Sequence, residues 1–196
     1  MSIKQVYAYY DQQTAPAAEG FRCCPYCRAD LLRMESGQKL RPTCPECGFV
    51  QFTNPSPAIS IVILQGENVL LGQRRGHPGA GQWAIPSGYV EFEDDFLTTA
   101  IREAKEETGL DVRIDSILNV VSSFFSPRFH FLSLYVTAHV GGGSLSAGDD
   151  LAAVAWYPLS GPLPELAFQE DIDMLAWYRD NRTQGLPVDP AFARPR

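Results

Sequence analysis

Two groups of residues in this 196-residue chain have types and spacings suited to metal chemistry. The first group is Glu103, Glu106 and Glu107, which lie in the stretch REAKEETGL. On a helix they cover an arc of about 100° beside an apolar face. Neighbouring carboxylates destabilise a helix slightly unless a cation joins them, and Mg²⁺ or Mn²⁺ binds carboxylate oxygens well. A solvated acidic helix face is the alternative interpretation of these glutamates by themselves.

The second group is a cluster of cysteines near the N-terminus. Cys24-Pro-Tyr-Cys27 and Cys44-Pro-Glu-Cys47 are two CxxC pairs separated by sixteen residues. That spacing is typical of a four-thiolate zinc site, in which a closed tetrahedron is structural and not catalytic. Reduced thiols or a redox CxxC motif are the alternatives. Cys23 competes with Cys24 as a ligand, but the two-residue spacing to Cys27 favours Cys24.

The elements that must position the glutamates follow from hydrophobic periodicity and turn residues. The expected elements are a hairpin at 58–75, a loop at 76–82, an extended piece at 83–92, a helix at 95–108, strands at 111–125, 128–140 and 154–159, and a helix at 169–182. Gly109 is expected to end the first helix. On the second, Ile172, Leu175, Ala176 and either Tyr178 or Arg179 are expected to set the face. Strands mixed with two separated helices predict an α+β fold with helices packed on a mixed sheet.

The residues around the glutamates extend the pattern. From Gly88 the chain continues with five residues, Asp94, seven residues and then Arg102-Glu103-Ala104-Lys105-Glu106-Glu107-Thr108-Gly109-Leu110. This resembles the Nudix box, G-x5-E-x7-R-E-U-x-E-E-x-G-U, with Asp94 as the one departure at a fixed position. The cysteine module upstream is similar to the zinc ribbon of one branch of that family, which includes NADH pyrophosphatases.

The resemblance implies a fold and a set of domains. The expected fold is a Nudix-type α/β/α sandwich with a mixed sheet, preceded by a small zinc ribbon. The expected division is an N-terminal arm at 1–20, a zinc ribbon at 21–53, a Nudix hydrolase domain at 57–182 and a C-terminal tail at 183–196.

The resemblance also implies a chemistry. Nudix enzymes hydrolyse a nucleoside diphosphate linked to another group, here of the ADP-ribose, NADH or FAD type, with Mg²⁺ or Mn²⁺ on the helix glutamates. Glu103, Glu106 and Glu107 map to the metal-binding glutamates, and Arg102 can hold one of them in place. The backbone carbonyl of Ser87 is a further candidate ligand. The family's additional downstream carboxylate maps to Asp150.

Other residues are weaker candidates, each with an ordinary structural alternative. Glu170 is a second choice for the downstream carboxylate. Arg74, Arg75 and Arg128 are candidates for binding phosphate, or simply for salt bridges. Phe125 and its neighbours Phe124, Phe129 and Phe131 are candidates for stacking a base, or ordinary core side chains.

Composition narrows the function classes. The net charge of −7 makes a general nucleic-acid-binding surface an unfavourable interpretation. No signal-peptide pattern or membrane-spanning apolar run is evident, so a cytoplasmic protein acting on a small-molecule nucleotide is expected, with no membrane partner. The aromatic segment YAYYD at 7–11 is a candidate contact for a homodimer. The NADH pyrophosphatase signature S-Q-P-W-P-F-P-x-S is absent, and a metabolite-sensing Nudix module without turnover is the alternative function.

Overall fold

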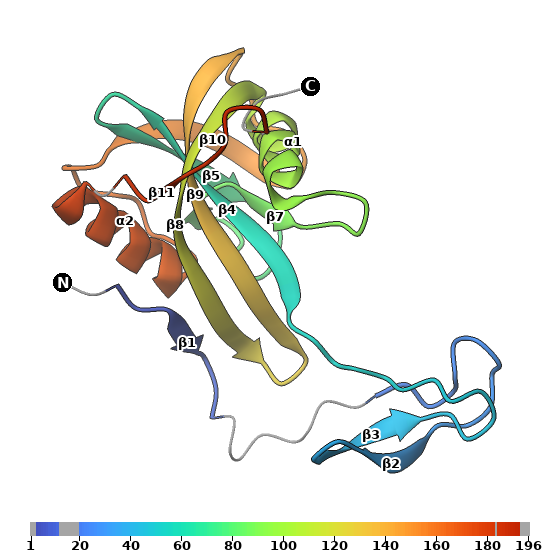
Figure 1. Cartoon of the computed structure of the whole chain (residues 1–196). Helices are drawn as coiled ribbons and strands as arrows, with labels where there is room; N and C mark the ends of the chain where they lie inside the picture. The colour runs from blue at the N-terminus through green and yellow to red at the C-terminus, as the bar shows by residue number, and fades with distance from the viewer. Residues whose placement is uncertain (1–2, 12–19, 183, 193–196) are drawn as a thin grey trace.

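The computed structural model describes residues 3–11, 20–182 and 184–192. Its elements are β1 (Val6–Ala8), β2 (Leu32–Ser36), β3 (Lys39–Thr43), β4 (Ser56–Gln65), β5 (Asn68–Arg74), β6 (Trp83–Ala84), β7 (Ser87–Tyr89), α1 (Phe96–Thr108), β8 (Leu110–Ser126), β9 (Phe129–Gly143), β10 (Leu151–Pro158), α2 (Gln169–Asn181) and β11 (Leu186–Pro187). Figure 1 shows α1 and α2 on opposite sides of one large sheet. The predicted α+β sandwich with a mixed sheet is confirmed.

The large sheet has the strand order β1-β8-β9-β4-β5-β10, with β11 beside β8, β6 beside β5 and β7 beside β4. The β1–β8 and β4–β9 pairs are parallel, and the remaining pairs are antiparallel. The predicted hairpin is confirmed, with Leu64 opposite Val69 at its turn. The β7–β4 pairing sets Gly88 opposite Ile59 and brings the segment before α1 onto the centre of the sheet.

Alternating side chains of β4 build a core on each face of the sheet. Ile59, Ile61 and Ile63 belong to the core under α1, whereas Val62 and Leu64 belong to the core under α2. All five side chains are at most 4% exposed. A strand buried on both faces is apolar throughout and not only at every second residue, which explains the continuous run at this point of the sequence.

Helix α1 begins and ends as its sequence predicts. The side chain of Asp95 accepts hydrogen bonds from the backbone N–H groups of Leu97 and Thr98 and so caps the N-terminus. Gly109 has φ 72°, and its N–H donates to the carbonyl of Lys105. A left-handed residue at this position favours glycine.

Helix α2 lies where predicted, but its buried face differs from the prediction. Ile172 is 41% exposed, whereas Asp171, Met174 and Leu175 are buried. The expected face did not include Asp171, and an isolated carboxylate is costly to bury. In the folded chain, hydrogen bonds from Tyr135 and from the backbone N–H of Ile85 offset that cost.

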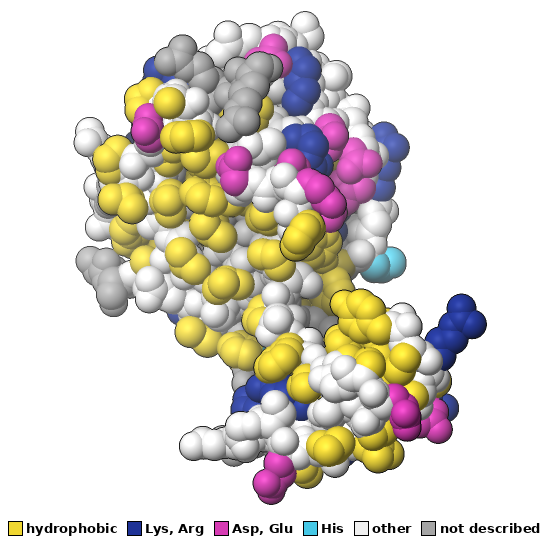
Figure 2. Space-filling model, turned by 45° about the vertical axis from the view of Figure 1, so that its right-hand side comes forward, with side chains coloured by type: hydrophobic (Ala, Val, Ile, Leu, Met, Phe, Trp, Pro, Cys, Tyr) yellow, Lys and Arg dark blue, Asp and Glu magenta, His cyan; other side chains and the backbone are white. Residues whose placement is uncertain are grey.

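The cysteine module forms a separate small unit around the antiparallel hairpin of β2 and β3. It lies beyond the end of the large sheet that carries the β8–β9 turn (Figure 1). Hydrophobic side chains are prominent on its surface, while acidic side chains gather on the larger unit near α1 (Figure 2). Its exposed large apolar residues are Phe21, Tyr26, Leu32, Met34, Leu40 and Phe52.

The N-terminal segment is part of the sheet. Strand β1 pairs in parallel with β8, with Tyr7 opposite Ser123. Tyr7, Tyr9 and Tyr10 of the YAYYD stretch all contact side chains of their own chain. A homodimer through this segment stays a prediction. Residues 1–2 and 12–19 of the expected N-terminal arm at 1–20 lie outside the described residues. Within the described part of the chain, no helix has the length and apolarity to span a bilayer.

Candidate active site

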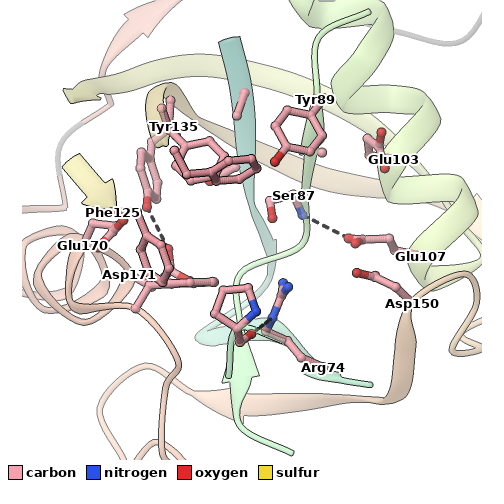
Figure 3. A pocket seen from close by; sticks show the side chains of 18 of the residues that line it. Arg74, Ser87, Tyr89, Glu103, Glu107, Phe125, Tyr135, Asp150, Glu170 and Asp171 are labelled. Atoms are coloured by element: carbon pink, nitrogen blue, oxygen red, sulfur yellow. Dashed lines mark hydrogen bonds between the residues drawn. The ribbon is translucent and has the colours of Figure 1, made fainter. Parts of the chain in front are cut away.

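A cavity of about 450 Å³ opens where β4, β7, β9, α1 and the N-terminus of α2 meet. Figure 3 shows carboxylates from α1 and from the segment before β10 on one side, and aromatic side chains with the start of α2 on the other. The lining includes Arg74, Ser87, Gly88, Tyr89, Glu103, Glu107, Phe125, Phe129, Phe131, Tyr135, Asp149, Asp150, Phe168, Glu170 and Asp171. The cavity therefore joins a charged end to an aromatic end.

Glu103 lies against the backbone of Gly88 and is only 8% exposed. A Cβ atom at Gly88 would lie 2.0 Å from Cδ of Glu103, closer than real side chains approach. The first glycine of the pattern therefore leaves room for the Glu103 side chain to lie against strand β7 in this position. Burial raises the pKa of Glu103, and the charge and hydrogen bond of Arg102 oppose that shift.

Glu107 is the most deeply buried of the three glutamates, at 4% exposure. Its Oε2 accepts a hydrogen bond of 3.0 Å from the backbone N–H of Ser87. Burial, followed by the negative charge of Asp150, raises the pKa of Glu107 to about 9. The hydrogen bond from Ser87 of β7 holds the Glu107 carboxylate in the cavity. Because burial and Asp150 disfavour its negative charge, a cation bound here would stabilise the ionised form.

Arg102 organises the outer carboxylates. Its Nε donates to Asp94 at 3.2 Å, and one terminal nitrogen contacts both Glu103, at 2.9 Å, and Glu106, at 2.8 Å. Asp94, the departure from the family pattern, still reaches the arginine even though its side chain is one methylene shorter. Glu106 is 49% exposed and turned toward this arginine, and it does not line the cavity.

The donor set fits a hard divalent cation. Glu103, Glu107 and Asp150 supply carboxylate oxygens at one end of the cavity, and Mg²⁺ and Mn²⁺ prefer such ligands. Two of these carboxylates are buried with raised pKa values, a condition that a bound cation would relieve. Within residues 3–11, 20–182 and 184–192, the ligand atoms of the four cysteines all lie within 4.8 Å of one another. No set of three or more carboxylates in these residues meets this criterion.

The remaining predicted residues divide into two sets. Arg74 and Phe125 line the cavity, whereas Arg75 and Arg128 do not; both of these are exposed. The backbone N–H of Arg75 donates to the carbonyl of Asp150 at 2.9 Å, so this residue helps to hold the downstream segment. Phe129 and Phe131 also line the cavity, and Phe124 instead packs edge-on against His130.

Sequence reasoning missed the buried pair of Tyr135 and Asp171 at the aromatic end. The hydroxyl of Tyr135 donates to Asp171 at 2.7 Å, and the backbone N–H of Ile85 donates to the same carboxylate at 3.1 Å. Burial raises the pKa of Asp171 to about 7. No periodic signal marks this pair because its members lie 36 residues apart.

The four predicted cysteines converge as expected for a metal site. Their sulfur atoms all lie within 4.8 Å of one another. Each CxxC pair forms the same turn, in which a left-handed residue, Arg28 or Gly48, donates its N–H to the carbonyl of the first cysteine. This arrangement is compatible with zinc. Cys23 lies outside the set, with its sulfur 3.8 Å from Asp30.

Comparison with known proteins identifies the family to which this chain belongs. A family model described as the NUDIX domain matches residues 54–178, which is more than half of the chain. The chain belongs to the Nudix hydrolase family. A crystal structure of a NUDIX hydrolase from Nitrosomonas europaea superposes with a TM-score of 0.72 at 24% identity, covering 86% of this chain and 96% of that one.

Two curated relatives show the range of named activities among similar proteins. An ADP-ribose pyrophosphatase of Methanocaldococcus jannaschii is 36% identical over 61% of this Nudix chain and 71% of its own. A NAD-capped RNA hydrolase, NudC, of Pectobacterium carotovorum is 28% identical over 86% of this chain, and the match spans 66% of its own length. The second name means that the expectation of no nucleic-acid partner is not supported.

Proposed function

We propose that this chain hydrolyses the diphosphate linkage of a nucleoside diphosphate joined to a second group, as in ADP-ribose, NADH or FAD, and releases a nucleoside monophosphate. The observation that carries the proposal is the cavity itself, which joins buried carboxylates at one end to aromatic side chains at the other. An anionic diphosphate needs cations at the first end, and a planar base can stack at the second. The names of the two curated relatives support the same substrate class.

Residues at the carboxylate end of the cavity are assigned to the metal. Glu103 and Glu107 are the central ligands of Mg²⁺ or Mn²⁺, with the carbonyl of Ser87 as an additional ligand. Glu106 has no direct contact with the ion in this proposal, because it faces Arg102 and does not line the cavity. When bound, such an ion would neutralise the diphosphate and acidify the attacking water. Asp150 lies beside Glu107 at the mouth of the cavity and is the proposed general base or additional ligand.

Substrate binding is assigned to Arg74 and to the aromatic end of the cavity. The guanidinium of Arg74 lies 5.2 Å from the centre of the Phe168 ring and is fixed by a 2.8 Å hydrogen bond from its Nε to the carbonyl of Pro78. We assign to Arg74 the contact with the second phosphate. Phe125 offers a ring for stacking. Arg75 and Arg128 have no direct contact in this proposal because neither lines the cavity.

The cysteine site has a structural role in the proposal. Four thiolates leave no open coordination position for a substrate. We assign Zn²⁺ to Cys24, Cys27, Cys44 and Cys47, where it holds the small β2–β3 unit together.

A substrate panel tests the proposed function. Release of nucleoside monophosphate is measured with Mg²⁺ and with Mn²⁺ for ADP-ribose, NADH, FAD, diadenosine polyphosphates and a NAD-capped RNA. Turnover of at least one member, abolished by a chelator, is the expected result. Tight binding of a member without any turnover would favour the sensing module and contradict the proposal.

A further inference from the structure

The aromatic end of the cavity contains a second carboxylate whose orientation is fixed by hydroxyl groups. In Figure 3, Glu170 lies across the cavity from Glu103 and Glu107. Its Oε1 accepts a 2.8 Å hydrogen bond from the hydroxyl of Ser123. Its Oε2 accepts a hydrogen bond from the hydroxyl of Tyr9. This carboxylate is therefore separate from the metal-binding end and is held in place from two sides.

Tyr9 comes from the N-terminal segment and is itself tied to the sheet and to α2. Its backbone N–H donates to the carbonyl of Phe124 at 3.0 Å, and its ring lies 5.2 Å from that of Phe125, a cavity residue. Its hydroxyl oxygen also accepts a 3.2 Å hydrogen bond from the backbone N–H of Gln169. Burial raises the pKa of Tyr9 above its ordinary value, so the hydroxyl keeps its proton for donation.

The chemistry of this wall limits what can bind there. A carboxylate has about four acceptor sites, so Glu170 keeps capacity for a ligand after its bonds to Ser123 and Tyr9. The adjacent Asp171 also lines the cavity. The negative charge of Glu170 repels a phosphate, and its free acceptor sites require hydrogen-bond donors. Sugar hydroxyls are such donors, and a carboxylate commonly binds them in nucleotide sites.

We propose that Glu170 accepts hydrogen bonds from sugar hydroxyls of the substrate, and that Tyr9 of the N-terminal segment is the positioning residue that holds Glu170 for this contact. The inference rests on the proposed function, since it assigns Glu170 to the part of the substrate that lies farther from the hydrolysed bond. It makes the segment that precedes the cysteine module a part of the substrate site of the Nudix domain.

The test compares two tyrosines of the same segment. Tyr9→Phe removes the hydroxyl that holds Glu170. Tyr7→Phe is the matched control, because the hydroxyl of Tyr7 donates to Asp173 of the same helix at 2.9 Å, and Asp173 does not line the cavity. We expect Tyr9→Phe to raise KM for ADP-ribose about tenfold with kcat nearly unchanged, as for one hydrogen bond to a charged group. Tyr7→Phe should lower Tm and leave KM unchanged.

A double variant shows whether Tyr9 acts through Glu170. Glu170→Gln should raise KM at least as much as Tyr9→Phe, and the double variant should be no worse than Glu170→Gln, because residues in one network are not additive. An unchanged KM in Tyr9→Phe, an equal rise in Tyr7→Phe, or additive effects would each overturn the inference.

Binding of a non-hydrolysable analogue separates this inference from the proposed function. Titration calorimetry with α,β-methylene ADP-ribose should show weaker binding by Tyr9→Phe and ordinary binding by Tyr7→Phe. If Tyr9→Phe binds the analogue more weakly than Tyr7→Phe but the unmodified chain hydrolyses no substrate, the proposed function is contradicted and the inference stands. If all variants bind the analogue equally well, the inference is wrong.

Discussion

Substitution of Gly88 by alanine tests how closely strand β7 must approach helix α1. The added Cβ would lie 2.0 Å from Cδ and 2.1 Å from Oε1 of Glu103, whereas real Cβ contacts are essentially never under 3.0 Å. A displacement on the order of 1 Å is therefore needed, and misplacement of that size in an active site can cost about 100-fold in rate. Strand β7 is held by its pairing with β4, so Glu103 is the group expected to move.

We expect Gly88→Ala to lower kcat for ADP-ribose by about 100-fold. The folding free energy should change little, because the two atoms nearest to the added Cβ are the far end of the flexible Glu103 side chain. Gly76→Ala is the matched control, because a Cβ there meets no atom within 4 Å; its kcat and Tm should match those of the unmodified chain. Circular dichroism at the assay temperature verifies that Gly88→Ala is folded. A folded Gly88→Ala protein with more than about half of the normal kcat would refute the role given to this contact.

Three further predictions address the ion pairs, the cysteines and the buried aspartate. Asp94→Asn should lower kcat by less than about tenfold, because Arg102 keeps its contacts with Glu103 and Glu106 and a partly exposed pair contributes little; complete loss of turnover would show that Asp94 acts directly. Metal analysis of the purified protein should find about one zinc per chain, and Cys44→Ser should release it; less than about 0.5 zinc in the unmodified chain would contradict the assignment. Because the pKa of Asp171 is raised to about 7, the folded protein keeps a proton between about pH 4 and 7 that the unfolded chain has lost, so stability falls as pH rises through that window. The Tm of Asp171→Asn minus the Tm of the unmodified chain should therefore increase from pH 4 to pH 7. A difference that stays constant over this range would show that burial does not raise the pKa of Asp171.

Helix α1 could be predicted because all its signals are local in the sequence. The box from Gly88 to Leu110 is contiguous, and the helix ends are marked by residues beside it. The close approach of Gly88 to Glu103 gives that spacing its physical reason. The interaction of Asp94 with Arg102 could not be predicted, because it depends on whether a shorter side chain still reaches its partner.

The aromatic end of the cavity could not be predicted, since its members come from distant segments. Tyr9 and Glu170 lie 161 residues apart in the chain. Strand β1 has three residues, and its parallel partner β8 is more than a hundred residues away. A pattern of alternating side chains identifies a strand but does not name its neighbour. The burial of Asp171 could not be predicted, because hydropathy alone does not register the donors of Tyr135 and Ile85.

Comparison of the unmodified chain with Glu107→Gln in the same release assay tests the central claim most directly. Glu107 is buried, and its carboxylate accepts the N–H of Ser87; glutamine keeps the shape and one acceptor oxygen but removes the negative charge. With saturating Mg²⁺ or Mn²⁺, we expect kcat to fall by more than about 100-fold while Tm shows that the variant is folded. Near-normal turnover by a folded Glu107→Gln protein would contradict the assignment of this carboxylate to metal-dependent hydrolysis.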